Sequence, residues 1–555
     1  MKKITFFLLC AVMGIGAMWA QTDVAGSGSK KVSLKIEELV TIDGSQYVLV
    51  NNEYADLYRA KDVSGTFAVP ASVNYGGKSY PVKNIRGMAF MESGATSVST
   101  SGTLEGVWSN AFTDARALQS VSLAEGVKMI EEGAFDSKTL QDIFVIDSNK
   151  YFAAVKGVLY NKEMTRLLSY PAGKRGASFT VPSTVQTIGK KAFSSCQLTS
   201  VTLPSSVKVI EEGAFEYCHN LESFAFGPNV TQIGADVFSN CNSLSSVSIP
   251  ASLTKIGVSA FGGCTALTAF TVASANPVFS AINGVLFSKD KKKLLVCPSG
   301  ISGTYAIPEG TVEIGHSAFD SCEKIENITF AKSVTKLDSL CFYDCKFRSI
   351  VIPNTIKEIP YGCFLFCNSM RDVTFSESLT TIGERAFDGC FALQDLTVPD
   401  KVVSIGKWAF SGCTGLRGDI TLGKSLTSIG NNAFIGANPR RIYCRSRIPC
   451  ALDYQSFDFS YLFDSCDVYV PRGCADAYQN ASGWEVFFNI YEYDVVFKGD
   501  VDGDGVVDIT DVNILLNIVL GKDSASKYGG RADVDGNGII DITDVNTALN
   551  IVLGK

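Results

Sequence analysis

Two short stretches near the C-terminus place carboxylates at the spacing that a hard metal ion requires. Residues 500–511 read DVDGDGVVDITD, and residues 533–544 read DVDGNGIIDITD. In each stretch, oxygen-bearing side chains occupy positions 1, 3, 5, 9 and 12, and glycine occupies position 6, where calcium-binding loops turn sharply. Since Ca²⁺ takes about six to eight oxygen ligands, we predict two calcium ions, one in each stretch.

Each predicted ion has five side-chain ligands and the backbone carbonyl of position 7. The first ion is predicted to bind Asp500, Asp502, Asp504, the carbonyl of Val506, Asp508 and Asp511. The second is predicted to bind Asp533, Asp535, Asn537, the carbonyl of Ile539, Asp541 and Asp544. The alternative is a pair of solvated acidic loops without metal, and two matches to one spaced pattern favour the metal.

Each loop leads into an apolar helix, VNILLNIVLGK from Val512 and VNTALNIVLGK from Val545. An ordinary EF-hand has a helix before the loop and Glu at position 12. Here an extended segment precedes the first loop and position 12 is Asp. The loop, the following helix and the tandem duplication resemble the type I dockerin over about residues 498–555. The resemblance implies a small all-α domain with two Ca²⁺ that binds a cohesin module of a scaffold protein.

The dockerin resemblance also implies which residues contact the partner, namely loop positions 10 and 11 and later helix residues. In this chain they are Ile509, Thr510, Leu516, Asn517, Ile542, Thr543, Leu549 and Asn550. Many cellulosomal members carry Ser-Thr at positions 10 and 11, whereas this chain carries Ile-Thr, so the identity of the partner stays open. The near-identity of the two halves implies docking in two orientations.

The rest of the chain is organised by a recurring phenylalanine, usually preceded by alanine. It occurs at Phe90, Phe112, Phe135, Phe193, Phe215, Phe238, Phe261, Phe319, Phe342, Phe364, Phe387, Phe410 and Phe434. The steps are 22 to 24 residues, apart from two steps of 58. A repeat this short cannot bury its own apolar side chains, so we expect the thirteen copies to stack into a solenoid.

A single repeat reads VTLPSSVKVIEEGAFEYCHNLES from Val201. It resembles the bacterial BspA-like leucine-rich repeat, IPxSVxxIGxxAFxxCxxL, over about residues 85–441. The predicted fold is a mainly β solenoid with an N-terminal leader and cap (21–84) and a C-terminal cap (442–497), followed by the dockerin-like domain (498–555). The two long steps contain matching inserts, about 146–180 and 272–306, that we interpret as β-hairpins. The resemblance implies surface adhesion and contact with an extracellular or host protein.

Nine of the seventeen cysteines fall three residues after the repeat phenylalanine. We predict a buried column of reduced thiols, because parallel Cβ vectors on neighbouring coils do not suit a disulfide. Cys341 and Cys363 replace the repeat alanine in adjacent coils and receive the same prediction. Cys444, Cys450, Cys466 and Cys474 lie off this column, where one or two bridges are open.

The exposed positions of the repeat strand form a face lined with small hydroxyl residues that becomes acidic toward its C-terminal end. Its candidate partner-binding residues are Asp372, Thr374, Asp395, Thr397, Asp419 and Thr421. A shallow face of this kind suits an extended protein partner with basic groups. The alternative is that small β-formers simply suit a tight sheet.

Bulk composition excludes some function classes. The formal charge is −7, of which the ten Asp and four Lys or Arg residues between 500 and 555 carry −6, so the body has no basic stripe for nucleic acid. Residues 1–20 read as an export signal peptide, and no other stretch is apolar enough for a membrane span. We find no catalytic constellation and predict no enzyme. We expect a secreted or cell-surface, non-catalytic binding protein tethered to a cohesin-like scaffold; the alternative is a structural accessory subunit of a polysaccharide-degrading multi-enzyme assembly.

Overall fold

The computed structural model describes residues 37–61, 63–453, 455–457, 466–495, 497–503 and 505–553. The predicted signal peptide and most of the predicted leader therefore lie outside the described residues, as does the predicted ligand Asp504. The chain divides into two compact units, one of residues 1–301 and 318–322 and the other of residues 302–317 and 323–555. Among the described residues, the structure has no helix with the length and apolar character of a membrane span.

The first unit begins with a mixed sheet, mostly antiparallel, that covers the start of the repeats. Its strands are β1 (Glu37–Ile42), β2 (Ser45–Val50), β3 (Tyr54–Arg59), β5 (Ser72–Tyr75) and β6 (Lys78–Ile85). Strands β5 and β6 form the predicted hairpin, with Gly76 and Gly77 both at positive φ in the turn. Strand β3 pairs in parallel with β6, and β6 with β8, so this sheet continues into the repeat ladder.

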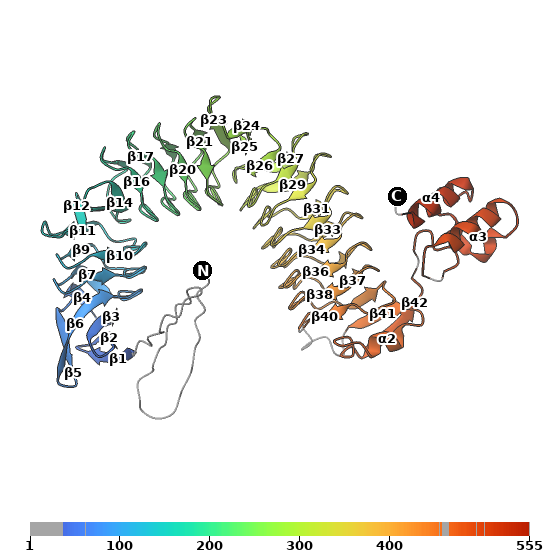
Figure 1. Cartoon of the computed structure of the whole chain (residues 1–555), viewed down its shortest axis with the longest axis horizontal. Helices are drawn as coiled ribbons and strands as arrows, with labels where there is room; N and C mark the ends of the chain where they lie inside the picture. The colour runs from blue at the N-terminus through green and yellow to red at the C-terminus, as the bar shows by residue number, and fades with distance from the viewer. Residues whose placement is uncertain are drawn as a thin grey trace, which may run out of the picture. The chain divides into compact units, whose positions relative to one another are not determined.

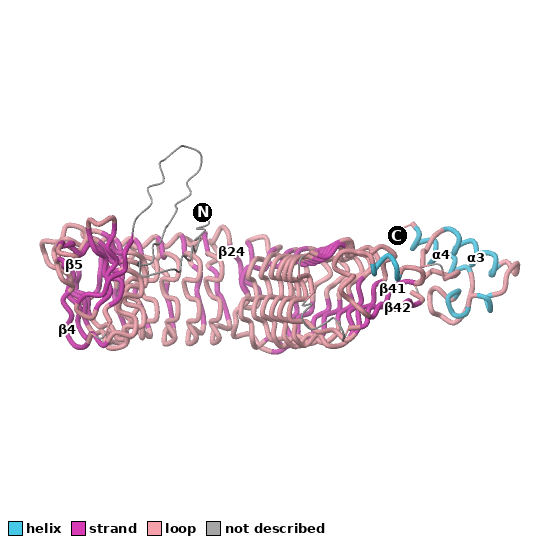
Figure 2. Tube along the Cα trace, turned by 90° about the horizontal axis from the view of Figure 1, so that it is seen from below, coloured by secondary structure: helices cyan, strands magenta, loops and turns pink. Residues whose placement is uncertain are grey.

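Each regular coil of the first unit contributes one strand to each of two parallel ladders. The longer strands are β4 (Ser64–Ala68), β7 (Gly94–Ser99), β9 (Ser120–Leu123), β11 (Asp142–Val145), β15 (Ser178–Thr180), β17 (Ser200–Thr202), β19 (Ser223–Ala225), β21 (Ser246–Ile249) and β23 (Ala269–Val272). The two-residue strands are β8 (Gly106–Val107), β10 (Met129–Ile130), β16 (Thr187–Ile188), β18 (Val209–Ile210), β20 (Gln232–Ile233) and β22 (Lys255–Ile256). The remainder of each coil is turn and loop (Figure 2).

The second unit repeats this arrangement in its own coils (Figure 1). The strands that correspond to the longer strands of the first unit are β27 (Gly303–Ala306), β29 (Ile325–Thr329), β31 (Ser349–Val351), β33 (Asp372–Thr374), β35 (Leu396–Thr397, only two residues), β37 (Asp419–Leu422), β39 (Arg441–Cys444), β41 (Asp467–Pro471) and β42 (Asn489–Tyr493). Its short strands are β28 (Glu313–Ile314), β30 (Lys336–Leu337), β32 (Glu358–Ile359), β34 (Thr381–Ile382), β36 (Ser404–Ile405), β38 (Ser428–Ile429) and β40 (Ala451–Leu452). Helix α2 (Ala475–Gln479) lies between β41 and β42.

The repeat phenylalanines form the core, as the period predicts. All thirteen are at most 5% exposed. Within each unit, consecutive rings stack with centroids 4.8–5.5 Å apart, for example 5.3 Å between Phe342 and Phe364. The coils are also joined along the backbone, because the amide of one repeat phenylalanine donates to the carbonyl of the residue before the next, as from Phe364 to Ala386 (2.8 Å).

The cysteine column is buried, and it does more than fill space. The thiol of Cys390 donates to the carbonyl of Phe364 in the preceding coil at 3.3 Å, and Cys413 donates likewise to Phe387 at 3.2 Å. A small thiol therefore supplies a partner to a buried carbonyl that would otherwise lack a second donor. The sixteen cysteines that the structure describes are all thiols. The four cysteines outside the column, for which the sequence allowed disulfide bonds, are buried and form no disulfide bond.

The ladder contains members that the Ala-Phe pattern does not identify. Tyr170, in the first insert, stacks on Phe193 at 5.3 Å, and Phe457 stacks on Phe434 at 4.9 Å. Cys297 takes the corresponding place in the second insert, where its amide donates to the carbonyl of Ala318. Strand β4 pairs in parallel with β7, and β39 pairs in parallel with β41, which pairs in turn with β42. Strands of both predicted caps therefore pair in register with strands of the repeats.

The inserts are antiparallel meanders of three strands rather than simple hairpins. The first contains β12 (Phe152–Val155), β13 (Val158–Asn161) and β14 (Arg166–Ser169), and the second contains β24 (Phe279–Ile282), β25 (Val285–Ser288) and β26 (Lys293–Val296). Asn149 and Asn276 begin them in the same way. Each buried amide donates to two backbone carbonyls of the preceding coil and accepts two backbone N–H groups of its own insert.

The C-terminal module is helical. It contains α3 (Ile509–Val519), the 3₁₀ turns η1 (Ala525–Lys527) and η2 (Gly529–Ala532), and α4 (Ile542–Val552). Its buried core is small and consists of Val501, Val512, Leu515, Ala532, Val534, Val545 and Ala548. So few apolar side chains supply little stability by themselves, which leaves a role for metal in holding the module together.

Candidate metal centre and repeat face

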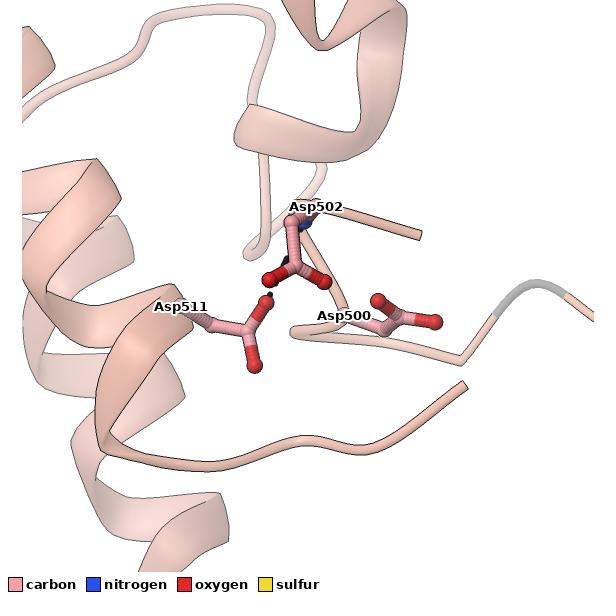
Figure 3. A group of neighbouring side chains, drawn as sticks. All are labelled: Asp500, Asp502 and Asp511. Atoms are coloured by element: carbon pink, nitrogen blue, oxygen red, sulfur yellow. Dashed lines mark hydrogen bonds between the residues drawn. The ribbon is translucent and has the colours of Figure 1, made fainter. Parts of the chain in front are cut away.

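Three carboxylates of the first loop converge on one point. Oxygens of Asp500, Asp502 and Asp511 lie within 4.8 Å of one another. Asp511, in the first turn of α3, turns its carboxylate toward the loop residue Asp502 (Figure 3). The loop is closed by backbone contacts to Asp511, whose Oδ1 accepts the amides of Val501 (2.7 Å) and Asp502 (3.2 Å) and whose Oδ2 accepts that of Asp508 (2.9 Å).

The second loop repeats this geometry. Oxygens of Asp533, Asp535 and Asp544 lie within 4.8 Å of one another, and Asp544 accepts the amides of Val534, Asp535 and Asp541 at 2.6–3.0 Å. The side-chain amide nitrogen of Asn537 donates to the carboxylate of Asp535 at 2.9 Å, so this predicted ligand also lies beside the cluster. The structure thus brings together the side chains predicted for positions 1, 3 and 12 of both loops.

The predicted ligands at position 9 have another role in this structure. Asp508 and Asp541 are the N-caps of α3 and α4, and each accepts the amide of the residue two positions later, Thr510 or Thr543, at 2.6 Å. The side-chain hydroxyl of Thr510 or Thr543, and then its backbone amide, lower the pKa of these carboxyl groups by hydrogen bonding. Neither belongs to the three-carboxylate clusters. A position-9 side chain often reaches Ca²⁺ through a water molecule, so the N-cap role is compatible with coordination of this kind.

The chemistry of the two clusters fits a hard divalent cation. Every side-chain ligand atom is an oxygen. Gly505 and Gly538 both have a φ of +83° at the turn, a backbone conformation that residues with a side chain rarely adopt. Burial, together with the charges of Asp511 and Asp502, raises the pKa of Asp500, although the amides of Gly503 and Gly505 act in the opposite direction. A bound cation would relieve the repulsion between these carboxylates.

The residues implied for partner contact lie on the accessible side of α3 and α4. Ile509 and Ile542 are 55% and 52% exposed, and Leu516 is 38% exposed. Thr510, Asn517, Thr543 and Asn550 are also exposed, whereas Leu549 is half-buried. Thr543 additionally donates its hydroxyl to Asp535 at 2.7 Å. The two helices therefore present nearly the same side chains from two separate sites.

The structure shows that fewer acidic side chains of the repeat face are available to a partner than the sequence predicted. Asp372, Thr374, Asp395 and Thr397 are exposed, and Asp419 and Thr421 are half-buried. Asp419 forms an ion pair with Arg441 at 2.8 Å, and Asp395 accepts the backbone amide of Asp419 at 2.9 Å. The charge of Asp419 is thus compensated within the chain, which leaves Asp372 and Asp395 as the acids available to a partner.

Three tyrosines occupy the strand positions that follow Thr374, Thr397 and Thr421 on the repeat face. The face predicted from the sequence ended at Thr421 and did not include them. Strand register places Tyr443, Tyr469 and Tyr491 on successive strands after Thr421. The rings of Tyr443 and Tyr469 stack at 4.9 Å, those of Tyr469 and Tyr491 lie 5.5 Å apart, and Tyr491 is 47% exposed. Tyr491 and Tyr493 alternate along the sequence as strand residues do, and this alternation was the signal that could have identified the tyrosines.

Comparisons with known families agree with this architecture. The family model "BspA type Leucine rich repeat region", in six copies, matches residues 77–156, 173–291, 303–417 and 380–469. The model "Dockerin type I domain" matches residues 498–551. A search of the curated proteins gave no match.

Solved structures with similarity to the chain include three bacterial proteins. A leucine-rich cell surface protein of Faecalibacterium prausnitzii is 25% identical, with 73% of this chain and 94% of that chain covered and a TM-score of 0.36. The pneumococcal vaccine antigen PcpA is 18% identical (87% and 100% covered, TM-score 0.41), and a leucine-rich repeat protein of Bacteroides ovatus is 23% identical (74% and 92% covered, TM-score 0.31). Since no TM-score reaches 0.5, the assignment rests on the family models. The chain belongs to the BspA-type leucine-rich-repeat proteins and carries a C-terminal type I dockerin domain.

Proposed function

We propose that this chain is a secreted or cell-surface, non-catalytic binding protein. Its repeat face recognises an extracellular protein, and its C-terminal module, loaded with two Ca²⁺, attaches it to a cohesin-like module of a scaffold protein. The observation that carries the proposal is the pair of matched three-carboxylate clusters, each at the start of a helix that presents exposed partner-type residues.

The link from metal to partner binding is short. Asp511 and Asp544 belong to the clusters and also to the first turns of α3 and α4. The residues directly before them, Thr510 and Thr543, are exposed and implied to contact the partner. Metal binding at either loop would therefore fix the direction of the helix that carries the contact residues.

Capture of recombinant cohesin modules by the full-length chain, followed by biolayer interferometry with calcium and then with a chelator, tests the tether. We expect capture only with calcium. The variant Asp511→Asn combined with Asp544→Asn should lose it, whereas Asp523→Asn, which removes an acid of the same module outside the clusters, should retain it. Calcium binding without capture of any cohesin would reject the scaffold part of the proposal.

A second experiment separates adhesion from an accessory role in a multi-enzyme, polysaccharide-degrading assembly. Charge reversal at the two uncompensated acids of the repeat face, Asp372→Lys with Asp395→Lys, should abolish capture of extracellular proteins while cohesin binding is unchanged. If a scaffold-associated set of hydrolases is instead recovered with both the native chain and this variant, the accessory role replaces adhesion.

A further inference from the structure

The first insert produces a hollow in the first unit, on the ridge formed by the turns that follow the repeat phenylalanines. In a regular coil this turn carries the column cysteine, but after Tyr170 the chain reads Pro171, Ala172 and Gly173. Ala172 is buried, and a side chain at Gly173 would collide with the backbone of Thr139, so this turn lies low between its neighbours. The hollow has a volume of about 430 Å³, within the range of roughly 300–1,000 Å³ typical of small-molecule sites.

The lining of this hollow combines an aromatic side chain with hydroxyl groups. Tyr217 is 45% exposed, and it shares its positive backbone φ of +59° with Ser195 and Asn240, which occupy the same place in the neighbouring coils. The turn of the repeat therefore directs this ring outward. The ring of His219 meets that of Tyr217 edge-on at 6.1 Å. Nδ1 of His219 lies 3.0 Å from the carbonyl oxygen of Asn240 and 3.4 Å from the side-chain amide nitrogen of Asn242.

Polar atoms in the hollow have unused hydrogen-bonding capacity. The hydroxyl of Thr113 is buried without a hydrogen-bond partner. Ser137 and Thr139 both donate to the carbonyl of Ala115 at 3.0 Å, which leaves their oxygens able to accept. Asp136 also lines the hollow, and its carboxyl group is half-buried, with a pKa raised by that burial. Buried polar groups of this kind call for a partner from a ligand or water.

The residues that line the hollow carry equal numbers of acidic and basic side chains. Asp114 and Asp136 are matched by Arg116 and Lys138, so an ion of either sign gains little here. A neutral ligand with many hydroxyl groups and an apolar C–H face would use the carboxylate and hydroxyls for hydrogen bonds and the ring of Tyr217 for stacking. We propose that the hollow binds a neutral hexopyranose unit of a glycan, held by Asp136 and the Ser and Thr hydroxyls and stacked against Tyr217.

The second insert offers a sequence comparison within the same chain. It has the same low turn, Pro298, Ser299 and Gly300 after Cys297. The positions that correspond to Asp136, Tyr217 and His219 hold Gly262, Asp344 and Lys346, so the stacking ring and the carboxylate are replaced. We therefore expect the sugar site at the first insert only.

Saturation-transfer NMR of the full-length protein with the methyl glycosides of glucose, galactose, mannose and N-acetylglucosamine tests the site. We expect transfer to the ring protons of at least one probe, and at least a tenfold weaker affinity for it in Tyr217→Ala and in the isosteric Asp136→Asn. Tyr361→Ala, which removes a 44% exposed tyrosine of the second unit, should leave the affinity unchanged, with circular dichroism confirming that all three variants fold.

Two results would overturn the inference. The first is absence of transfer to every probe. The second is transfer that persists unchanged in both Tyr217→Ala and Asp136→Asn. Tighter binding of glucuronate than of the matching neutral glucoside would reject the assignment of a neutral ligand, because the balanced lining gives no reason for that preference.

Discussion

The repeat body and the C-terminal module achieve stability by opposite means. In the body, regular coils stack their phenylalanines on one another and are joined by backbone hydrogen bonds and, where the column cysteine is present, by thiol hydrogen bonds. In the module, seven buried apolar residues support two loops whose carboxylates repel one another until a cation binds. The comparison teaches that the two parts of the chain draw on different sources of free energy, so we expect the body to keep its fold without metal and the module to depend on it.

Removal of calcium should produce the largest difference between the two regions. With a chelator we expect the module to lose its helical circular dichroism and its own calorimetric transition, while the transition of the body stays at the same temperature. A ligand at about 1,000 times its Kd stabilises the folded state by about 4 kcal/mol, which is as large as the whole stability of a small domain. A shift of both transitions together would show that the regions are not independent.

Truncation of one ladder phenylalanine should destabilise the body alone. We expect Phe364→Ala to lower the free energy of unfolding of the body by about 3–5 kcal/mol, because it leaves a cavity between two stacked rings. Urea denaturation followed by tyrosine fluorescence measures the loss, and calcium titration should give the native affinity. A loss below about 1 kcal/mol would contradict continuous stacking through this coil.

Ionisation of buried thiols at alkaline pH should act on the body alone, since residues 498–555 contain no cysteine. Burial raises the pKa of Cys264 from 9.0 to about 12, so above pH 9 the unfolded chain loses a proton that the folded chain keeps, and stability falls as pH rises. This thiol should account for about 1.4 kcal/mol of the loss between pH 8 and pH 10. Cys264→Ala should reduce that pH dependence by this amount in urea denaturation, and an unchanged pH dependence would argue against a buried thiol.

The smallest expected effect concerns the caps of the module helices. Asp508→Ala should cost about 1 kcal/mol of module stability, the usual cost of losing an N-cap, when measured at saturating calcium. Asp541→Ala is the matched variant in the second half and should behave alike. A cost of several kcal/mol at saturating calcium would show that position 9 coordinates the ion directly.

The sequence predicted the features that repeat. Each coil places its phenylalanine in the same environment, and nine coils do the same with a cysteine, so a period of 22 to 24 residues was sufficient to predict their burial. The cluster residues at positions 1, 3 and 12 of the loops were predicted for the same reason, since the spacing of ligands is set by the chemistry of the ion.

The features that were missed depend on tertiary context. Tyr170 and Phe457 stack in the ladder without a preceding alanine, and only the three-dimensional register identifies them. The capping role of Asp508 competes with coordination for the same carboxylate, a competition that spacing cannot resolve. The ion pair of Asp419 with Arg441 joins neighbouring strands 22 residues apart, and the tyrosine column lies where the repeat pattern had already ended.

Hydrogen exchange measured by mass spectrometry on the full-length chain, with calcium and with a chelator, tests the central claim most directly. The account predicts that chelation removes protection from residues 509–519 and 542–552 and leaves the coils around Phe215 and Phe387 as protected as before. Protection of the two helices that persists without calcium, or loss of protection in the coils, would contradict it.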